Sequence, residues 1–183
     1  MSVQVSKRLI TVGEYHKMGE VGILKEKGLE LINGEITEMS PKGSKHAAIL
    51  ARINKILSKQ LGELIIRIQD PIIAGNFSEP EPDVAVLKYR DDFYGEEHPH
   101  VEDVLLVIEI GDTSIAYDRK VKLPIYAESG VPECWLIDLN KKEIYTYWQP
   151  SGNAYKFSEL VREGEMVQAQ YFELAIPIQE ILG

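Results

Sequence analysis

The longest regular pattern of apolar residues lies in the segment HAAILARINKILSKQLGE, from His46 to Glu63. Its large aliphatic side chains recur at helical spacing, at Ile49, Leu50, Ile53, Ile56, Leu57 and Leu61. This spacing puts them on one face and predicts an amphipathic helix that stops near Gly62. A shorter helix is predicted after Thr11, because Thr11 and Glu14 have the spacing of a capping box.

Shorter apolar runs predict β-strands. The run VLLVIEI, from Val104 to Ile110, is apolar at nearly every position, which is the pattern of a central strand buried on both faces. Strands are also expected in LIIRIQDPII and PDVAVL, in ECWLIDL and EIYTYW, and in a short N-terminal hairpin that turns at Asn33-Gly34. The C-terminal tail is expected to add one strand and a short helix.

Between two of these strands, the segment IAYDRKVKLPIYAESG predicts a helix with Ser114 as its cap and Gly130 as its end. Pro124 lies inside it and should kink the helix or start its second half, since proline removes one backbone hydrogen bond. The order of elements predicts an α/β fold with a central mixed β-sheet. No repeat or linker interrupts the chain, so one domain over residues 1–183 is expected.

Composition narrows the class of protein. The net charge of −9 argues against a protein that coats nucleic acid, but it allows local contact with phosphate through a bound metal. The stretch MSVQVSKRLI is too short and too charged for a signal sequence, and no apolar run approaches the roughly 20 residues of a membrane span. We therefore expect a cytoplasmic protein without a membrane segment. The single cysteine, Cys134, is expected to be a buried structural thiol.

Two acids stand out against this background. Glu109 interrupts the apolar run VLLVIEI, where a carboxylate is costly to bury unless a cation or a proton compensates it. Asp83 follows Pro82 at the start of PDVAVL. If the two strands are neighbours, their carboxylates meet at one end of the sheet and offer the hard oxygen ligands that Mg²⁺ or Mn²⁺ accepts.

A cation follows closely in sequence. Asp118 and Lys122 are four residues apart and share a face of the helix after Glu109, so Lys122 could assist a water or phosphate held between the acids. Taken alone, each signal also has an ordinary structural explanation. EPEPD can be a stiff solvated turn, Asp118 and Lys122 an exposed helix pair, and His46 the beginning of its helix. Glu109 is the hardest to explain as a solvated residue.

The residues PD, the acid in a buried strand and YDRKVKLPIYAESGVPECWLIDL resemble the putative restriction endonuclease family of small bacterial proteins, within the PD-(D/E)xK nuclease superfamily. The resemblance implies a restriction endonuclease-like core, a central mixed β-sheet flanked by helices, with N-terminal and C-terminal β-hairpins. It implies Asp83 and Glu109 as metal ligands and Lys122 as the active-site lysine. The wider superfamily places its lysine two residues after the acid, where this chain has Gly111.

The same resemblance gives second-rank candidates at Glu35 and His46, and Asp118 is a third second-rank candidate. The primary hypothesis is a Mg²⁺- or Mn²⁺-dependent nuclease in which an activated water cleaves phosphodiester bonds, with DNA as the implied partner and a homodimer suited to cutting both strands. One alternative is a catalytically silent nuclease-fold protein that binds nucleic acid or a protein partner. Another is a hydrolase of small phosphorylated molecules. Sequence specificity and biological role are not encoded in any of these patterns.

Overall fold

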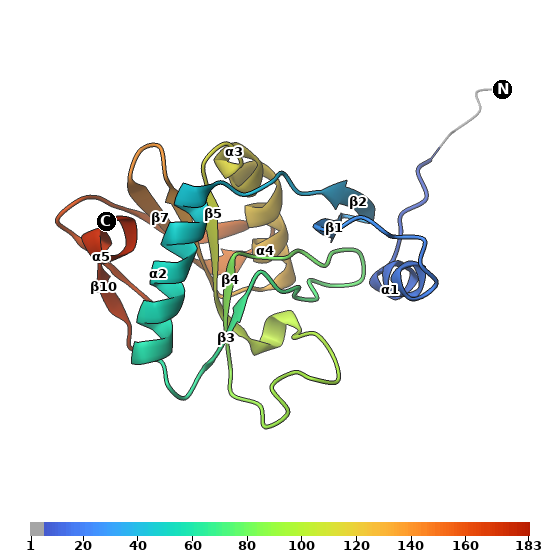
Figure 1. Ribbon diagram of the computed structural model, residues 1–183, viewed down its shortest axis with the longest axis horizontal. Coiled ribbons are helices and arrows are strands. Elements are labelled where there is room, and N and C mark those ends of the chain that lie inside the picture. Colours follow the sequence, from blue (N-terminus) through green and yellow to red (C-terminus); the bar gives the residue numbers. More distant parts are fainter. Residues whose placement is uncertain (1–5) are drawn as a thin grey trace.

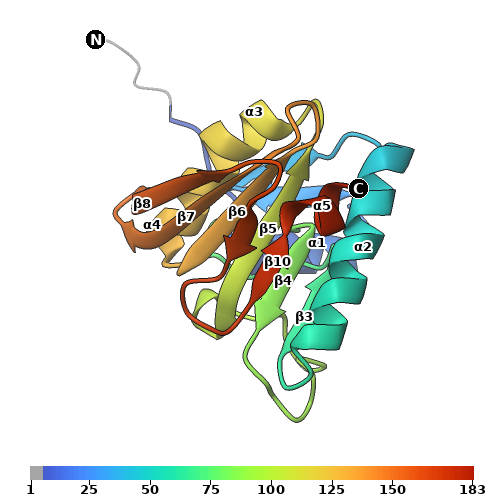
Figure 2. The same ribbon diagram turned by 90° about the vertical axis from the view of Figure 1, so that its left-hand side faces the viewer.

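The computed structural model describes residues 6–183, so half of the N-terminal stretch considered above for a signal sequence lies outside the described part. Its centre is a six-stranded sheet with the order β3-β4-β5-β6-β7-β8 (Figures 1 and 2). The strands are β3 (Ile65–Ile68), β4 (Val84–Leu87), β5 (Val104–Gly111), β6 (Glu133–Asp138), β7 (Glu143–Ser151) and β8 (Ala154–Val161). Only β5 and β6 run parallel, which confirms the predicted mixed sheet.

Helices cover both faces of this sheet (Figure 1). The long helix α2 (Ser44–Gln60) confirms the strongest helical pattern and buries Ile49, Ile53 and Leu57 against β4 and β5. The C-terminal elements β9 (Met166–Gln168), β10 (Ala175–Pro177) and α5 (Ile178–Leu182) pack into the same core. The tail therefore forms β8, β9 and β10, and the prediction of a single further strand was wrong.

The opposite face is covered by one continuous helical segment with three parts, α3 (Ile115–Tyr117), the π-helical turn η2 (Asp118–Lys122) and α4 (Leu123–Ser129). The wide turn directly precedes Pro124, which lies in the first turn of α4 where its missing N–H costs little. Pro124 thus starts the second half of the helix, as predicted. Ser114 makes no side-chain cap, since its own backbone is already helical.

The N-terminal part lies beside the end of the sheet (Figure 1). It contains α1 (Val12–Glu20), with the predicted capping box at Thr11, and the hairpin of β1 (Leu29–Ile32) and β2 (Glu35–Glu38). The hairpin turns at Asn33-Gly34, both with positive φ, and a Cβ on Gly34 would lie 2.6 Å from that of Leu9. An isolated bridge between Leu31 and Glu79 ties the hairpin to the segment that leads into β4.

The structure also tests the strand expected in LIIRIQDPII and the expected burial of Cys134. The strand expected in LIIRIQDPII ends at Ile68, because Gln69 has φ 53° and turns the chain out of the sheet. A short 3-10 helix, η1 (Val101–Asp103), then leads into β5.

Cys134 is fully buried in β6, where burial raises the pKa of its thiol well above the ordinary value, as expected of a structural cysteine. None of the helices formed by residues 6–183 combines the length and hydrophobicity needed to cross a bilayer.

Candidate active site

Asp83 and Glu109 come to the same end of the sheet. Strands β4 and β5 are antiparallel neighbours with Val84 opposite Ile108, so one step further along the ladder Asp83 falls opposite Glu109. Asp83 directly precedes the first residue of β4, and both carboxylates are buried, at 5% and 3% exposure. Glu109 contacts the helical segment 115–129 through Lys122 and Tyr126. Asp83 instead contacts Lys42, before α2, and His46, in the first turn of α2.

Asp83 is surrounded by hydrogen-bond donors. Its Oδ1 accepts bonds from Lys42 Nζ at 3.0 Å and Gln69 Nε2 at 3.2 Å. Its Oδ2 lies 3.0 Å from His46 Nε2 and accepts a bond of 2.8 Å from the backbone N–H of Ile110. Burial alone would raise the pKa of Asp83, but the bond from His46, the charges of Lys42 and His46, and the Ile110 N–H lower it to about 2. Asp83 is thus a fixed anion.

Glu109 has a different environment. Its Oε1 accepts bonds from Lys122 Nζ at 3.1 Å and from the Tyr126 hydroxyl at 2.5 Å. Burial raises the pKa of Glu109, Lys122 opposes this, and the negative charges of Asp83, Asp118 and Glu30 add to the rise, which reaches about 8. At neutral pH this carboxyl therefore holds its proton.

Lys122 joins the two acids Glu109 and Glu30. The π-helical turn carries its side chain inward, where it is 4% exposed, and its Nζ donates to Glu30 Oε1 at 2.7 Å as well as to Glu109. Burial lowers the pKa of a lysine, but here Glu109 in its ionised form, the negative charge of Glu30 and the hydrogen bond to Glu30 outweigh burial and raise it. Lys122 therefore stays charged. The spacing to Asp118 that suggested an exposed pair instead belongs to a buried turn.

Glu30 is an acid of the site that the sequence analysis missed. It is 1% exposed in β1, and its Oε1 also accepts the backbone N–H of Glu81 at 2.7 Å. The signal was present, because Glu30 interrupts the apolar run LELI in the same way as Glu109 interrupts VLLVIEI. The chosen candidate in this hairpin, Glu35, is not brought to the site. Its side chain is 53% exposed and pairs with Lys7 at 2.6 Å.

The other two second-rank candidates do lie at the site. His46, in the first turn of α2, contacts Asp83 as described, and its Nδ1 is buried with no hydrogen-bond partner among residues 6–183. Asp118 is 4% exposed, and burial raises its pKa. The charge of Lys122 and a hydrogen bond from Ser114 lower this pKa, whereas the charges of Asp83 and Glu30 raise it further. Lys42, which precedes α2, was not anticipated because its place in the loop SPKGSK carries no pattern.

These acids form one group, which we call the carboxylate cluster: Glu30, Glu81, Asp83, Glu109 and Asp118. The acids of this cluster outnumber the adjacent cations Lys42, His46 and Lys122. Burial first, and then the charges of neighbouring acids, raise the pKa of Glu81, Glu109 and Asp118. Hard oxygen donors with uncompensated negative charge suit Mg²⁺ or Mn²⁺. Within residues 6–183, no three His, Cys, Asp or Glu side chains are grouped to hold one ion. A metal here would take two carboxylates and complete its shell with water and substrate, as Mg²⁺ commonly does.

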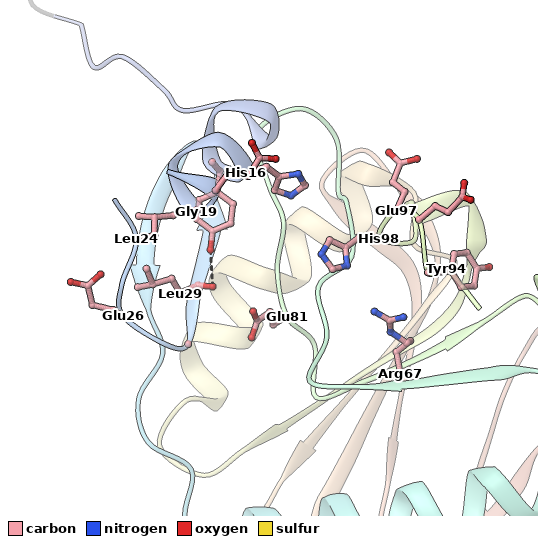
Figure 3. A pocket seen from close by; sticks show the side chains of 15 residues that line it. His16, Gly19, Leu24, Glu26, Leu29, Arg67, Glu81, Tyr94, Glu97 and His98 are labelled. Atoms are coloured by element: carbon pink, nitrogen blue, oxygen red, sulfur yellow. Dashed lines mark hydrogen bonds between the residues drawn. The ribbon is translucent and has the colours of Figure 1, made fainter. Parts of the chain in front are cut away.

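A cavity of about 830 Å³ opens beside the cluster, and Glu81 forms part of its wall (Figure 3). Figure 3 shows His16, His98 and Arg67 around the same space, between α1 and the loop before β5. His16 is held by Glu79 at 2.6 Å. Five glutamates and a single arginine line the cavity, so its field disfavours a bare phosphate unless a cation accompanies it.

Comparison with known proteins identifies the family and the fold of this chain. Residues 12–179 match the model of the Uma2 family, described as putative restriction endonuclease. A solved structure, of a putative nuclease belonging to DUF820 from Anabaena variabilis, is 18% identical with a TM-score of 0.69, and the likeness covers 94% of this chain and 97% of that chain. That likeness shows the shared α/β nuclease fold. The comparison with curated proteins gives no match. Since the family model covers most of the sequence, this chain belongs to the Uma2 family of putative restriction endonucleases.

Proposed function

We propose that this protein is a metal-dependent nuclease that hydrolyses phosphodiester bonds in DNA. One observation supports the proposal: Asp83, just before β4, and Glu109, in the neighbouring strand β5, are buried at the same end of the sheet, with Lys122 bonded to Glu109, in a chain of a nuclease family. The same acids on an isolated surface would carry little weight, but their burial costs several kcal/mol that function would explain.

In this proposal Asp83 and Glu109 hold Mg²⁺ or Mn²⁺. The ion supplies Lewis acidity toward phosphate and lowers the pKa of a bound water. Asp83 is already ionised and needs no proton transfer before it binds a cation. Glu109 must first release its proton, and the positive charge of Lys122 at 3.1 Å favours the ionised form.

Lys122 has the second role. Its ammonium is held between Glu109 and Glu30 and cannot lose its proton at neutral pH, so it serves as a fixed positive charge rather than as a base. Such a charge stabilises the negative charge that grows on a phosphate oxygen during attack by water. Lys42 and His46 fix the orientation of Asp83, which makes them positioning residues.

The test is cleavage of duplex DNA by wild type, Asp83→Asn and a matched surface control, Asp91→Asn, with Mg²⁺ and with Mn²⁺. Asp83→Asn should lower the rate by about 100-fold or more and should abolish the rise in melting temperature on adding metal. Asp91 is exposed, so its variant should behave as wild type. A melting-temperature gain equal to that of wild type in Asp83→Asn would remove Asp83 as a ligand.

The same experiment separates the alternatives. A wild-type protein that binds DNA but leaves it intact with either metal would be the catalytically silent nuclease-fold protein. Faster turnover of a small phosphodiester than of a long duplex would point to a hydrolase of small phosphorylated molecules.

A further inference from the structure

A second, smaller pocket of about 340 Å³ lies on the helical segment 115–122. Its other wall is the turn between β6 and β7. Strands β5 and β6 are parallel neighbours paired as far as Gly111 and Asp138, so both walls of the pocket follow the carboxyl ends of adjacent strands. In α/β sheets this edge is where ligands commonly bind.

The charge of this pocket is opposite to that of the large cavity. Arg119, Lys120 and Lys141 line it, and within residues 6–183 none of the three forms an ion pair with a carboxylate. The acid in its lining is Asp138, whose Oδ1 is engaged by the backbone N–H groups of Asn140 at 3.1 Å and Lys141 at 3.0 Å. The pocket therefore keeps a local positive charge in a chain with a net charge of −9.

Arg119 is the most constrained of the three cations. Its guanidinium carbon lies 4.1 Å from the centre of the Tyr145 ring, a cation–π contact that fixes the guanidinium plane. Its Nε and Nη2 are buried and have no hydrogen-bond partner among the described residues. Stacking on a ring supplies no acceptor in the guanidinium plane, and unsatisfied donors of this kind cost free energy. An oxyanion in the pocket would supply the countercharge that Arg119 lacks among the described residues.

We propose that this pocket binds a phosphate group, and that the phosphate belongs to the nucleic-acid strand being cleaved, a short distance from the scissile bond. The inference rests on the proposed nuclease function. Asp118 and Lys122 turn one side of the helical segment toward the carboxylate cluster, while Arg119 and Lys120 line the pocket. A helix with side chains is about 10 Å across, a distance that a strand of a few nucleotides spans.

The shape supports a strand rather than a lone ion. Ile115 and Ala116 line the pocket beside the cations, so a sugar can rest on apolar side chains while its phosphate meets Arg119. Such a contact would position the substrate without reading its bases. It also explains how an acidic protein can hold a polyanion, since the positive charge is concentrated where the backbone would pass.

The experiment compares two double variants that remove the same charge, Lys120→Gln with Lys141→Gln in the pocket, and Lys55→Gln with Lys59→Gln on exposed α2. All four lysines are exposed, so folding should be preserved. Binding of labelled duplex and single-stranded DNA is followed by fluorescence anisotropy from about 50 to about 200 mM salt, with EDTA and with Ca²⁺. The pocket variant should bind about tenfold more weakly, with a salt slope smaller by about 2. The α2 variant should change less than about threefold.

Equal effects of the two double variants would overturn the pocket as a phosphate site and leave the nuclease proposal standing. A second arm measures the melting temperature in inorganic phosphate against chloride at matched ionic strength. If wild type binds no DNA, the substrate of the proposed function is wrong. In that case, a phosphate-induced gain that the pocket variant loses would identify a free phosphate compound as the ligand. Absence of that gain would overturn the site as well.

Discussion

The two sides of the carboxylate cluster differ although both are built around a buried acid at the same sheet end. On one side, Asp83 is met by four donors from the loop before α2, α2 itself, the end of β3 and β5. On the other, Glu109 has two donors on one oxygen and faces Glu30 and Asp118. The pKa of Asp83 is about 2 and that of Glu109 is about 8.

Burial raises the pKa of both acids, so burial does not explain the difference. The number of donors and the sign of the neighbouring charges decide it. Asp83 is held ready as an anion, whereas Glu109 stores a proton that a cation at the site would displace. Metal binding at this cluster should therefore release a proton, and it should strengthen as the pH rises toward 8.

The largest effect should come from removing the positive charge of Lys122 on the Glu109 side. Lys122→Met keeps the length and the apolar stem but leaves Glu109 and Glu30 without their shared cation. We expect the cleavage rate to fall by about 100-fold or more, because a charge that stabilises the transition state is lost. We also expect the free energy of unfolding to fall by about 3 kcal/mol, because removing one partner strands buried acids.

Urea unfolding and cleavage assays on Lys122→Met measure both effects, with Lys55→Met on exposed α2 as the control. The stability loss should shrink toward pH 5, where protonation of the stranded acids relieves them. Near-wild-type cleavage by Lys122→Met would show that Lys122 is structural and leave the two acids alone with the metal.

The second-largest effect is the difference in stability between a variant of Asp83 and a variant of Glu109. Asp83→Asn turns an amide N–H₂ toward groups that are themselves donors, so near pH 7 it should lower the free energy of unfolding by about 2 kcal/mol. Glu109→Gln replaces a carboxyl that is already neutral in the folded protein, so it should leave stability unchanged or raise it. Both measurements are made in EDTA. Equal losses in the two variants would refute the difference in protonation.

The two central acids of this site could be predicted from the sequence, but several of the side chains that surround them could not. Asp83 and Glu109 could be found because each acid adjoins a strongly apolar strand, and burial of such a residue is readable from the pattern alone. That the two strands are neighbours was a condition of the prediction, and the structure shows that β4 and β5 pair antiparallel. Glu30 carried the same signal in a run of only four residues, and Glu35 was preferred in its place on family resemblance.

Tertiary contacts account for what the pattern left out. Lys42 and His46 reach Asp83 across 41 and 37 residues of chain, and no local pattern encodes such a contact. The π-helical turn at 118–122 directly precedes Pro124 and buries Lys122, whereas periodicity alone predicts an ordinary helix. The end of β3 at Gln69 depends on one residue with positive φ, which glutamine seldom adopts.

The smallest expected effect, taken per pH unit, concerns pH and uses the opposite pKa shifts of the two acids. The pKa of Glu109 is raised from 4.5 in the unfolded chain to about 8 in the folded protein. Its protonation therefore contributes stability that is complete below pH 4.5 and is lost as the pH rises toward about 8. Asp83 is lowered from 3.8 to about 2, so its contribution is complete above pH 4 and is lost only on acidification. Between about pH 5.5 and 7.5, Asp83 is therefore silent and Glu109 makes stability fall with rising pH.

The size of the effect is at most about 1.4 kcal/mol for each pH unit, one proton's worth of linkage. Glu81 and Asp118 also have raised pKa values and add slopes of the same sign, so the wild-type slope alone does not isolate Glu109. The difference between wild type and Glu109→Gln does, when both are unfolded in urea with EDTA across this pH range. The variant should have the shallower slope, because its amide takes up no proton. Parallel slopes would mean that Glu109 is ionised in the folded protein, held by Lys122 as Asp83 is held by Lys42 and His46.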